Sequence, residues 1–142
     1  MIDNCFIALT TIHAQTVTFS SATSTASQSY TRPGNSGTFY YQAIEVRVPI
    51  TGSYTFSTSS SIADTFGYLY QGNFYPSYPQ YNLVAQDDDS AGSGQFKITA
   101  DLRSDLVYYL IFTSYYPGNT GSFTVTATGS SSATLNSVYI NN

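Results

Sequence analysis

Hydrophobic and polar positions alternate along much of this chain in short runs. In IEVRV at 44–48, Ile and Val occupy every second position and charged residues lie between them. The runs FKIT at 96–99 and SFTVTAT at 122–128 show the same alternation. Successive side chains of a β-strand point to opposite faces, so each run predicts a strand with one face in the core and the other in water.

The run LVYYLIFTS at 106–114 differs because it is apolar at odd and even positions alike. Such a strand is buried on both faces, so we expect it at the centre of a sheet. Turn-forming residues separate the runs, which predicts an all-β fold, a two-sheet antiparallel β-sandwich of the Ig-like or jelly-roll-like kind. Strands are expected near 5–12, 15–20, 27–31, 38–49, 52–58, 64–70, 81–86, 94–101, 106–114, 121–128 and 133–140.

The composition supports an extracellular β protein. Of the 142 residues, 16% are aromatic and 8% are charged, and Ser and Thr together supply 40. Thr, Tyr and Phe suit the half-buried surface of a sheet, whereas helix-forming residues are scarce. The length predicts one domain, which we place at 16–142, preceded by an extra N-terminal strand extension over 1–15.

Charge and hydropathy exclude two classes of partner. Four basic residues and a net charge of −4 provide no basic surface for nucleic acid. No apolar run approaches the roughly 20 residues that a membrane-spanning helix needs, so we expect no membrane span. The expected location is extracellular or at the cell surface.

Several segments resemble one family of extracellular domains. They are YLY at 68–70, NLVAQDDDSAGSGQF at 82–96, YYLIFTSYY at 108–116 and GSFTVTATG at 121–129. Together they make the stretch from about 39 to 129 similar to pre-peptidase C-terminal (PPC) domains, which are small secreted β-sandwiches. The resemblance implies an auxiliary binding or adhesive role. It also implies calcium binding, because the related collagen-binding modules bind this ion.

Three consecutive acidic residues, Asp87, Asp88 and Asp89, lie between two expected strands. Their mutual repulsion is unfavourable unless a cation or backbone N–H groups compensate it, and Ca²⁺ prefers carboxylate and carbonyl oxygens. Asp64 precedes another strand and adds a ligand if the two loops share one end of the sandwich. The alternative is a turn in which these carboxylates accept backbone N–H groups and otherwise face water.

An aromatic stretch, YLYQGNFYPSYPQYN at 68–82, surrounds two prolines. Aromatic rings on a stiff loop offer a flat surface to a glycan or a protein ligand. The alternative, which we favour for Tyr68 and Tyr70, is that the rings pack inside the sandwich. The candidate ligand-binding residues are Phe74, Tyr75, Tyr78 and Tyr81, extended by Tyr115 and Tyr116.

Catalysis has little support in this sequence. His13 is the single histidine and Cys5 the single cysteine, and no Gly-x-Ser-x-Gly turn is present. One His and one Cys also cannot complete a four-ligand zinc site. We therefore expect a protein that is not an enzyme, and a hydrolase is the weakest of three hypotheses.

The apolar segment CFIALTTI at 5–12 has two interpretations. It resembles the apolar part of a signal peptide, but the preceding MIDN carries Asp3 and no basic residue. As a strand, it needs a sheet to satisfy its backbone groups. Within its own chain it would be an edge strand, whereas between chains it would be a donor strand. The candidate donor residues are Phe6, Ile7, Leu9, Ile12, Val17 and Phe19.

Strand donation favours a structural role. Donor and acceptor surfaces differ, so the contact repeats into a ring or an open fibre. This layout resembles pilus-like fibrils of Ig-like subunits joined by N-terminal strand insertion. The leading hypothesis is a structural or adhesive fibre subunit that self-associates into a homopolymer, with the tail at 130–142 as a second exchanger or an edge cover. The alternative is a stand-alone, calcium-assisted glycan- or collagen-binding module.

Overall fold

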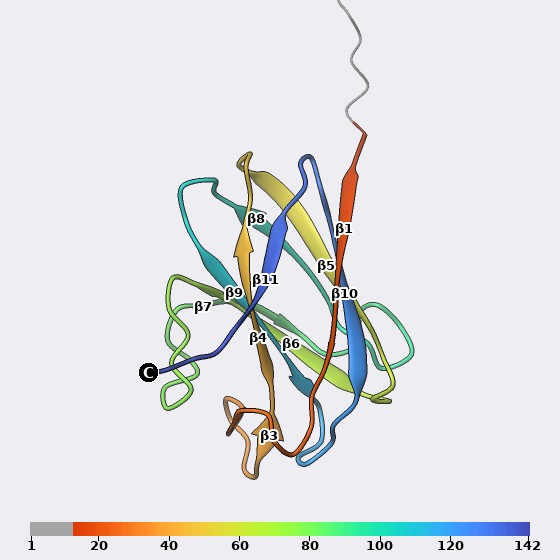
Figure 1. The fold of residues 1–142 in the computed structure, drawn as a ribbon, viewed down its shortest axis with the longest axis vertical. Helices are drawn as coiled ribbons and strands as arrows, with labels where there is room; N and C mark the ends of the chain where they lie inside the picture. The colour runs from red at the N-terminus through yellow and green to blue at the C-terminus, as the bar shows by residue number, and fades with distance from the viewer. Residues whose placement is uncertain (1–12) are drawn as a thin grey trace, which may run out of the picture.

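Eleven β-strands form between residues 13 and 142, the range that this computed structural model describes, and the same range contains no helix (Figure 1). Consequently, no helix there is long and apolar enough to cross a membrane. The strands are β1 (Gln15–Ala22), β2 (Ser29–Tyr30), β3 (Phe39–Tyr40), β4 (Gln42–Arg47), β5 (Gly52–Ser60), β6 (Thr65–Gln71), β7 (Leu83–Asp87), β8 (Lys97–Leu102), β9 (Tyr108–Ser114), β10 (Ser122–Gly129) and β11 (Thr134–Val138).

Two antiparallel sheets pack as a sandwich, which confirms the predicted fold class. One sheet has four strands in the order β1-β10-β5-β8, and the other has five in the order β11-β4-β9-β6-β7. Strands β2 and β3 form a separate small hairpin. Observed strands lie close to the expected positions, because alternation is a local property that survives packing. The strand expected near 5–12 lies outside the described residues.

The main core lies between the two sheets and uses the predicted inward faces. Ile44 and Val46 of β4, Ile98 of β8 and Val125 of β10 are almost completely buried. Rings from the two sheets meet face to face, because Phe112 of β9 stacks on Phe123 with 3.8 Å between ring centroids. This contact joins the two layers near the end of the sandwich at which β10 begins and β5 ends.

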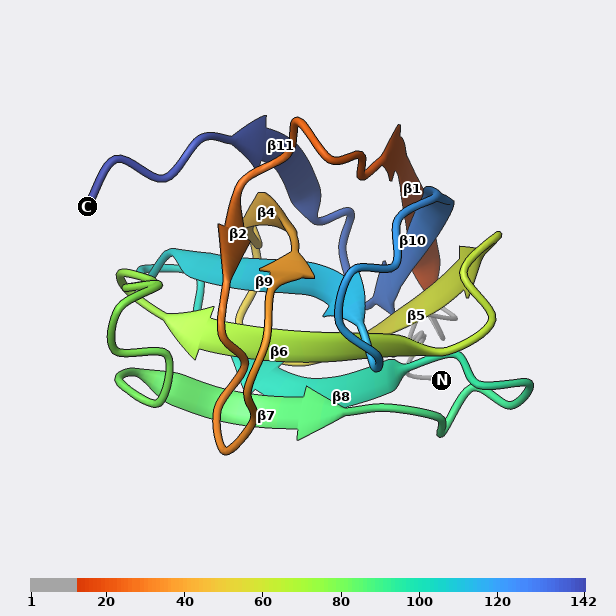
Figure 2. The same ribbon diagram turned by 90° about the horizontal axis from the view of Figure 1, so that it is seen from below.

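A second core covers the outer face of the five-stranded sheet. The hairpin β2–β3 crosses over β9 and β6 on this side (Figure 2). Tyr68 and Tyr70 of β6 are buried there, so the prediction that they are buried is confirmed, but they lie under the hairpin and not inside the sandwich, where Leu69 packs instead. The strand β9 contributes to both cores and lies third of five, which confirms the central position predicted from its two apolar faces.

Phe74 belongs to this second core and is 1% exposed. Its ring contacts those of Tyr30, Tyr41 and Tyr70. The prediction that Phe74 is an exposed ligand-binding residue is therefore wrong. A sheet that is buried on both faces needs apolar side chains over each face. The loop after β6 places Phe74 over the outer face of the five-stranded sheet.

Strand β1 pairs with β10 of the same chain, with Val17 opposite Ala127 and Phe19 opposite Val125. The prediction that Val17 and Phe19 belong to a strand donated to a neighbour is therefore corrected. Pairing within the chain provides hydrogen-bond partners for the backbone groups along one edge of β1. It also turns the side chains of Val17 and Phe19 towards the main core. Phe6, Ile7, Leu9 and Ile12 lie outside the described residues.

Strand β11 also pairs inside the chain, in register with β4. The tail therefore covers the edge of β4, the second of its two expected roles. The sandwich consequently extends beyond the stretch from 39 to 129, because β1 and β11 are the edge strands that precede and follow it.

Candidate functional site

The acidic residues meet at one end of the sandwich. The N–H of Thr65 donates to the carbonyl of Gly94 at 2.8 Å, so the loop before β6 lies against the loop between β7 and β8. Gly94 has a φ of +74°, and a Cβ there would stand 2.3 Å from the carbonyl oxygen of Ala63. This close approach brings Asp64 to the same end as Asp88, as the calcium hypothesis requires.

Asp87 has a structural role in this loop. Its Oδ2 accepts the backbone N–H groups of Ser90 and Lys97, each at 2.9 Å, and its Oδ1 accepts the Ser90 hydroxyl at 2.6 Å. Burial acts to raise the pKa of Asp87, but these hydrogen bonds outweigh it and the pKa is lowered. Asp87 thus fits the turn interpretation of the acidic triplet.

Asp64 and Asp89 have the opposite electrostatic character. Burial, followed by the charge of Asp88, raises the pKa of Asp64, and its buried Oδ1 has no hydrogen-bond partner within the described chain. The charge of Asp88 raises the pKa of the exposed Asp89. Among residues 13–142, no three His, Cys, Asp or Glu side chains are grouped so that they could hold a metal ion. Calcium binding by Asp64, Asp87, Asp88 and Asp89 therefore stays a prediction.

The substitution Asp64→Asn is expected to raise the stability of the protein at neutral pH. Because the folded-state pKa of Asp64 lies above its ordinary value, the ionised carboxylate disfavours the folded state, and stability is lost as the pH rises through that raised pKa. The gain should stay below about 1 kcal/mol because solvent screens the site. Urea denaturation of both proteins at neutral and acidic pH measures the difference.

The gain should vanish in acid, where both side chains are neutral, and Asp101→Asn on β8 is the matched control. A variant that is less stable at neutral pH would contradict the prediction. Repeating the series with calcium tests the calcium hypothesis, because a bound ion would stabilise the wild type more than Asp64→Asn.

The expected aromatic patch is divided between the two ends of the sandwich. Tyr78 and Tyr81, in the loop after β6, are more than half exposed, and their rings stack at 5.5 Å. Tyr115 and Tyr116 follow β9, whose last residue pairs with the first residue of β6. The length of β6, about 20 Å for seven residues, therefore separates the Tyr115–Tyr116 pair from the Tyr78–Tyr81 pair. Tyr75 is half-buried beside the first pair. Tyr115 and Tyr116 instead share the acidic end, since the Tyr115 N–H donates to the Asp64 carbonyl.

Arg32 is a buried residue that the sequence did not identify. It is 3% exposed, and its guanidinium lies over the rings of Phe66 at 4.3 Å and Phe39 at 4.7 Å. It donates to the Tyr68 hydroxyl at 3.0 Å and to the Tyr115 carbonyl at 2.7 Å. Arg32 thereby fastens the β2–β3 loop to the five-stranded sheet. The only sequence signal was its position before the Pro33-Gly34 turn.

The side of the sandwich between β1 and β11 is open at the backbone level. Each strand is the edge of its sheet, and the two lie side by side without being paired (Figure 1). Val17 and Phe19 of β1 and Leu135 of β11 are half-buried and pack against the main core beside this boundary. We call this boundary, formed by residues 15–22 and 134–138, the β1–β11 seam. It offers unpaired strand edges next to apolar side chains.

Comparison with known proteins returned no matching family model and no matching curated protein sequence. The sheet topology shows an all-β protein with two main antiparallel sheets, and the comparisons identify no family for it.

Proposed function

We propose that this protein is an extracellular structural or adhesive subunit, and that the N-terminal segment of one copy completes a sheet edge of the next. The β1–β11 seam is the observation that supports this proposal. Two unpaired edges flank half-buried Val17, Phe19 and Leu135, and a further strand would cover these side chains while satisfying backbone groups.

The edge of β1 carries none of the features that normally prevent strand addition. Its sequence, QTVTFSSA, has no charge and no proline over eight residues. Natural sheets protect long edges with Lys, Pro or bulges, because an unprotected edge pairs with other chains. The uncharged edge of β1 is therefore suited to a specific partner strand.

The donor in this proposal is the segment at 5–12, whose apolar residues include Phe6, Ile7, Leu9 and Ile12. Only His13 and Ala14 separate it from β1, and neither is the Gly, Asn or Asp that two-residue hairpins prefer. Folding back onto its own β1 is therefore disfavoured, whereas a neighbouring copy imposes no such turn. Because the two surfaces differ, repeated donation produces an open fibre or a ring.

Deletion of residues 1–12 tests the proposal. The shortened protein should remain a folded monomer, because all the described strands lie after residue 12, while the full chain forms filaments or rings. Negative-stain electron microscopy and sedimentation of both proteins, together with circular dichroism, provide the comparison. Deletion of residues 139–142 serves as the control at the other terminus and should leave assembly intact.

Filaments that persist unchanged without residues 1–12 would refute strand donation from this end, as would a full chain that stays monomeric. A peptide of residues 1–14 added to the shortened protein should bind one equivalent and raise its melting temperature. This second measurement detects strand binding directly, without requiring fibres to form.

A second candidate function is a calcium-assisted glycan- or collagen-binding module, the role that the PPC resemblance implies. The observation in its favour is that exposed Tyr115 and Tyr116 share one end of the sandwich with Asp64, Asp88 and Asp89. Both proposals assign no catalytic step to the chain.

A further inference from the structure

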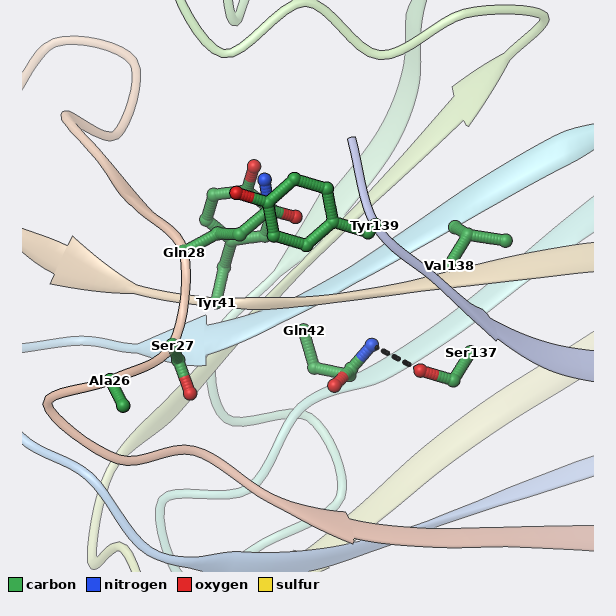
Figure 3. Close-up of a pocket in the computed structure, with 8 residues that line it drawn as sticks. All are labelled: Ala26, Ser27, Gln28, Tyr41, Gln42, Ser137, Val138 and Tyr139. Carbon is green, nitrogen blue, oxygen red and sulfur yellow. Dashed lines mark hydrogen bonds between the residues drawn. The ribbon is translucent and has the colours of Figure 1, made fainter. Parts of the chain in front are cut away.

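A small pocket lies where the chain before β2 passes the end of β11. Its volume is about 180 Å³, and Figure 3 shows the side chains around it. In this view Tyr139, Tyr41 and Gln28 lie together above Gln42 and Ser137, and Ser27 lies beside Ala26 to the left of them. The pocket is thus built from three segments that are distant in the sequence.

The walls of this pocket are held in place by hydrogen bonds. The Gln28 side chain accepts the N–H of Ile140 at 2.9 Å and donates to its carbonyl at 2.8 Å, as a paired strand residue would. The Gln42 amide donates to the Ser137 hydroxyl at 2.9 Å and so joins β4 to β11. These contacts fix the tail that carries Tyr139, so the pocket is largely formed before any ligand arrives.

Polar groups of both kinds remain available at the pocket. The Ser27 oxygen accepts the Ser24 N–H at 2.9 Å, which leaves its own hydrogen to donate. Ser137 likewise accepts from Gln42 and can donate, while the Gln42 Oε1 accepts no hydrogen bond from the described chain. Donors and acceptors therefore alternate within one small space, as neighbouring hydroxyl groups of a sugar require.

An aromatic wall completes the pocket. Tyr139 is 72% exposed, the largest exposure among the large hydrophobic side chains described, while the neighbouring Tyr41 is 3% exposed. Burial, and then the proximity of Tyr139, raises the pKa of Tyr41 to about 12. The Tyr41 hydroxyl is neutral at physiological pH, as that of an ordinary tyrosine is. Tyr139 offers an apolar ring face beside polar groups, the combination through which aromatic residues hold ligands with one apolar and one polar side.

From these features we propose that the pocket binds one neutral pyranose ring, with the sugar's C–H face on Tyr139 and its hydroxyls on Ser27, Gln42 and Ser137. All eight lining residues are uncharged, so nothing in the lining compensates the charge of a uronic acid or a phosphate. The volume is below the roughly 300 Å³ at which pockets for drug-sized ligands begin, which restricts the ligand to a single ring. This proposal does not depend on fibre formation.

Saturation-transfer NMR on the full chain tests the proposal, because the signal is read from the sugar and remains measurable when the protein assembles. The probes are the methyl pyranosides of glucose, galactose, mannose and N-acetylglucosamine at tens-of-millimolar concentration, with methyl glucuronide as the charged probe. At least one neutral sugar should receive saturation, and the glucuronide should not. Tyr139→Ala should weaken the binding by about tenfold, since it removes the aromatic contact.

Two further variants separate the pocket from the rest of the surface. Val84→Ala removes an exposed apolar side chain on β7, outside the pocket, and should leave binding unchanged. Gln42→Leu retains Tyr139 but removes the amide and should also weaken binding, with circular dichroism confirming the fold. The proposal is overturned if no neutral pyranoside receives saturation, if Tyr139→Ala binds as the wild type does, or if Val84→Ala is the variant that loses binding.

Discussion

Replacing Phe112 by alanine is expected to lower the free energy of unfolding by about 3–5 kcal/mol. Phe112 lies on β9, the central strand of the five-stranded sheet, and is completely buried. Its ring stacks on Phe123 of the other sheet with an angle of 10° between the planes and also contacts Phe96. The truncation therefore removes one of the contacts between the layers and leaves a cavity that the two β-sheets cannot close by a small shift.

Urea denaturation followed by tyrosine fluorescence or circular dichroism measures this loss. A domain of this size is stable by about 5–15 kcal/mol. The variant should therefore lose between about a fifth and nearly all of its free energy of unfolding. Phe112→Leu keeps most of the volume and should cost less than half as much, whereas Val84→Ala at an exposed position should change stability by under about 0.5 kcal/mol. A loss for Phe112→Ala as small as that for Val84→Ala would show that the two sheets do not depend on this contact.

The second large effect is expected at Arg32, where Arg32→Ala should cost about 2–4 kcal/mol. The change removes the cation from the Phe39 and Phe66 rings and deprives the Tyr68 hydroxyl and the Tyr115 carbonyl of a donor. It acts locally first, because Arg32 holds the β2–β3 loop on the five-stranded sheet. Amide hydrogen exchange of residues 29–41 should accelerate more than exchange in β5 and β10.

Two variants show which property of Arg32 matters. Arg32→Lys keeps the charge but lacks the planar group that reaches Tyr68 and Tyr115 together, so most of the loss should remain. Arg32→Met fills the space between the rings without a charge and should cost less than Arg32→Ala. If Arg32→Lys is as stable as the wild type, charge alone holds the loop and the hydrogen-bond geometry has no role.

The strands and their buried faces were predictable because they depend on near neighbours in the sequence. Alternation in IEVRV and SFTVTAT reports which side of a strand is apolar, and the structure buries those sides. The two apolar faces of LVYYLIFTS likewise required a covered strand, and β9 lies at the centre of its sheet. For Tyr68 and Tyr70 the sequence predicted burial but not the face, because the outer face is covered by a hairpin that no local pattern announces.

The candidate sites were less predictable because they depend on which loops meet in space. Phe74 and Tyr78 belong to one loop, yet only Phe74 enters the second core. The antiparallel pairing of β6 with β9 sends Tyr115 and Tyr116 to the end opposite Tyr78 and Tyr81. For the acidic residues, proximity of Asp64 to Asp88 required the contact between Thr65 and Gly94, which no local pattern encodes.

The sequence by itself determined that this protein is a β-sandwich with few charges, because the period of its apolar positions and its composition are properties of the chain alone. Only the tertiary structure decided that β1 and β11 are edge strands of opposite sheets, that Arg32 is buried among aromatic rings, and that Gln42 and Tyr139 meet at one pocket. The physical reason is that strand partners are chosen by contacts between residues far apart in the chain, and many pairings satisfy the same alternation.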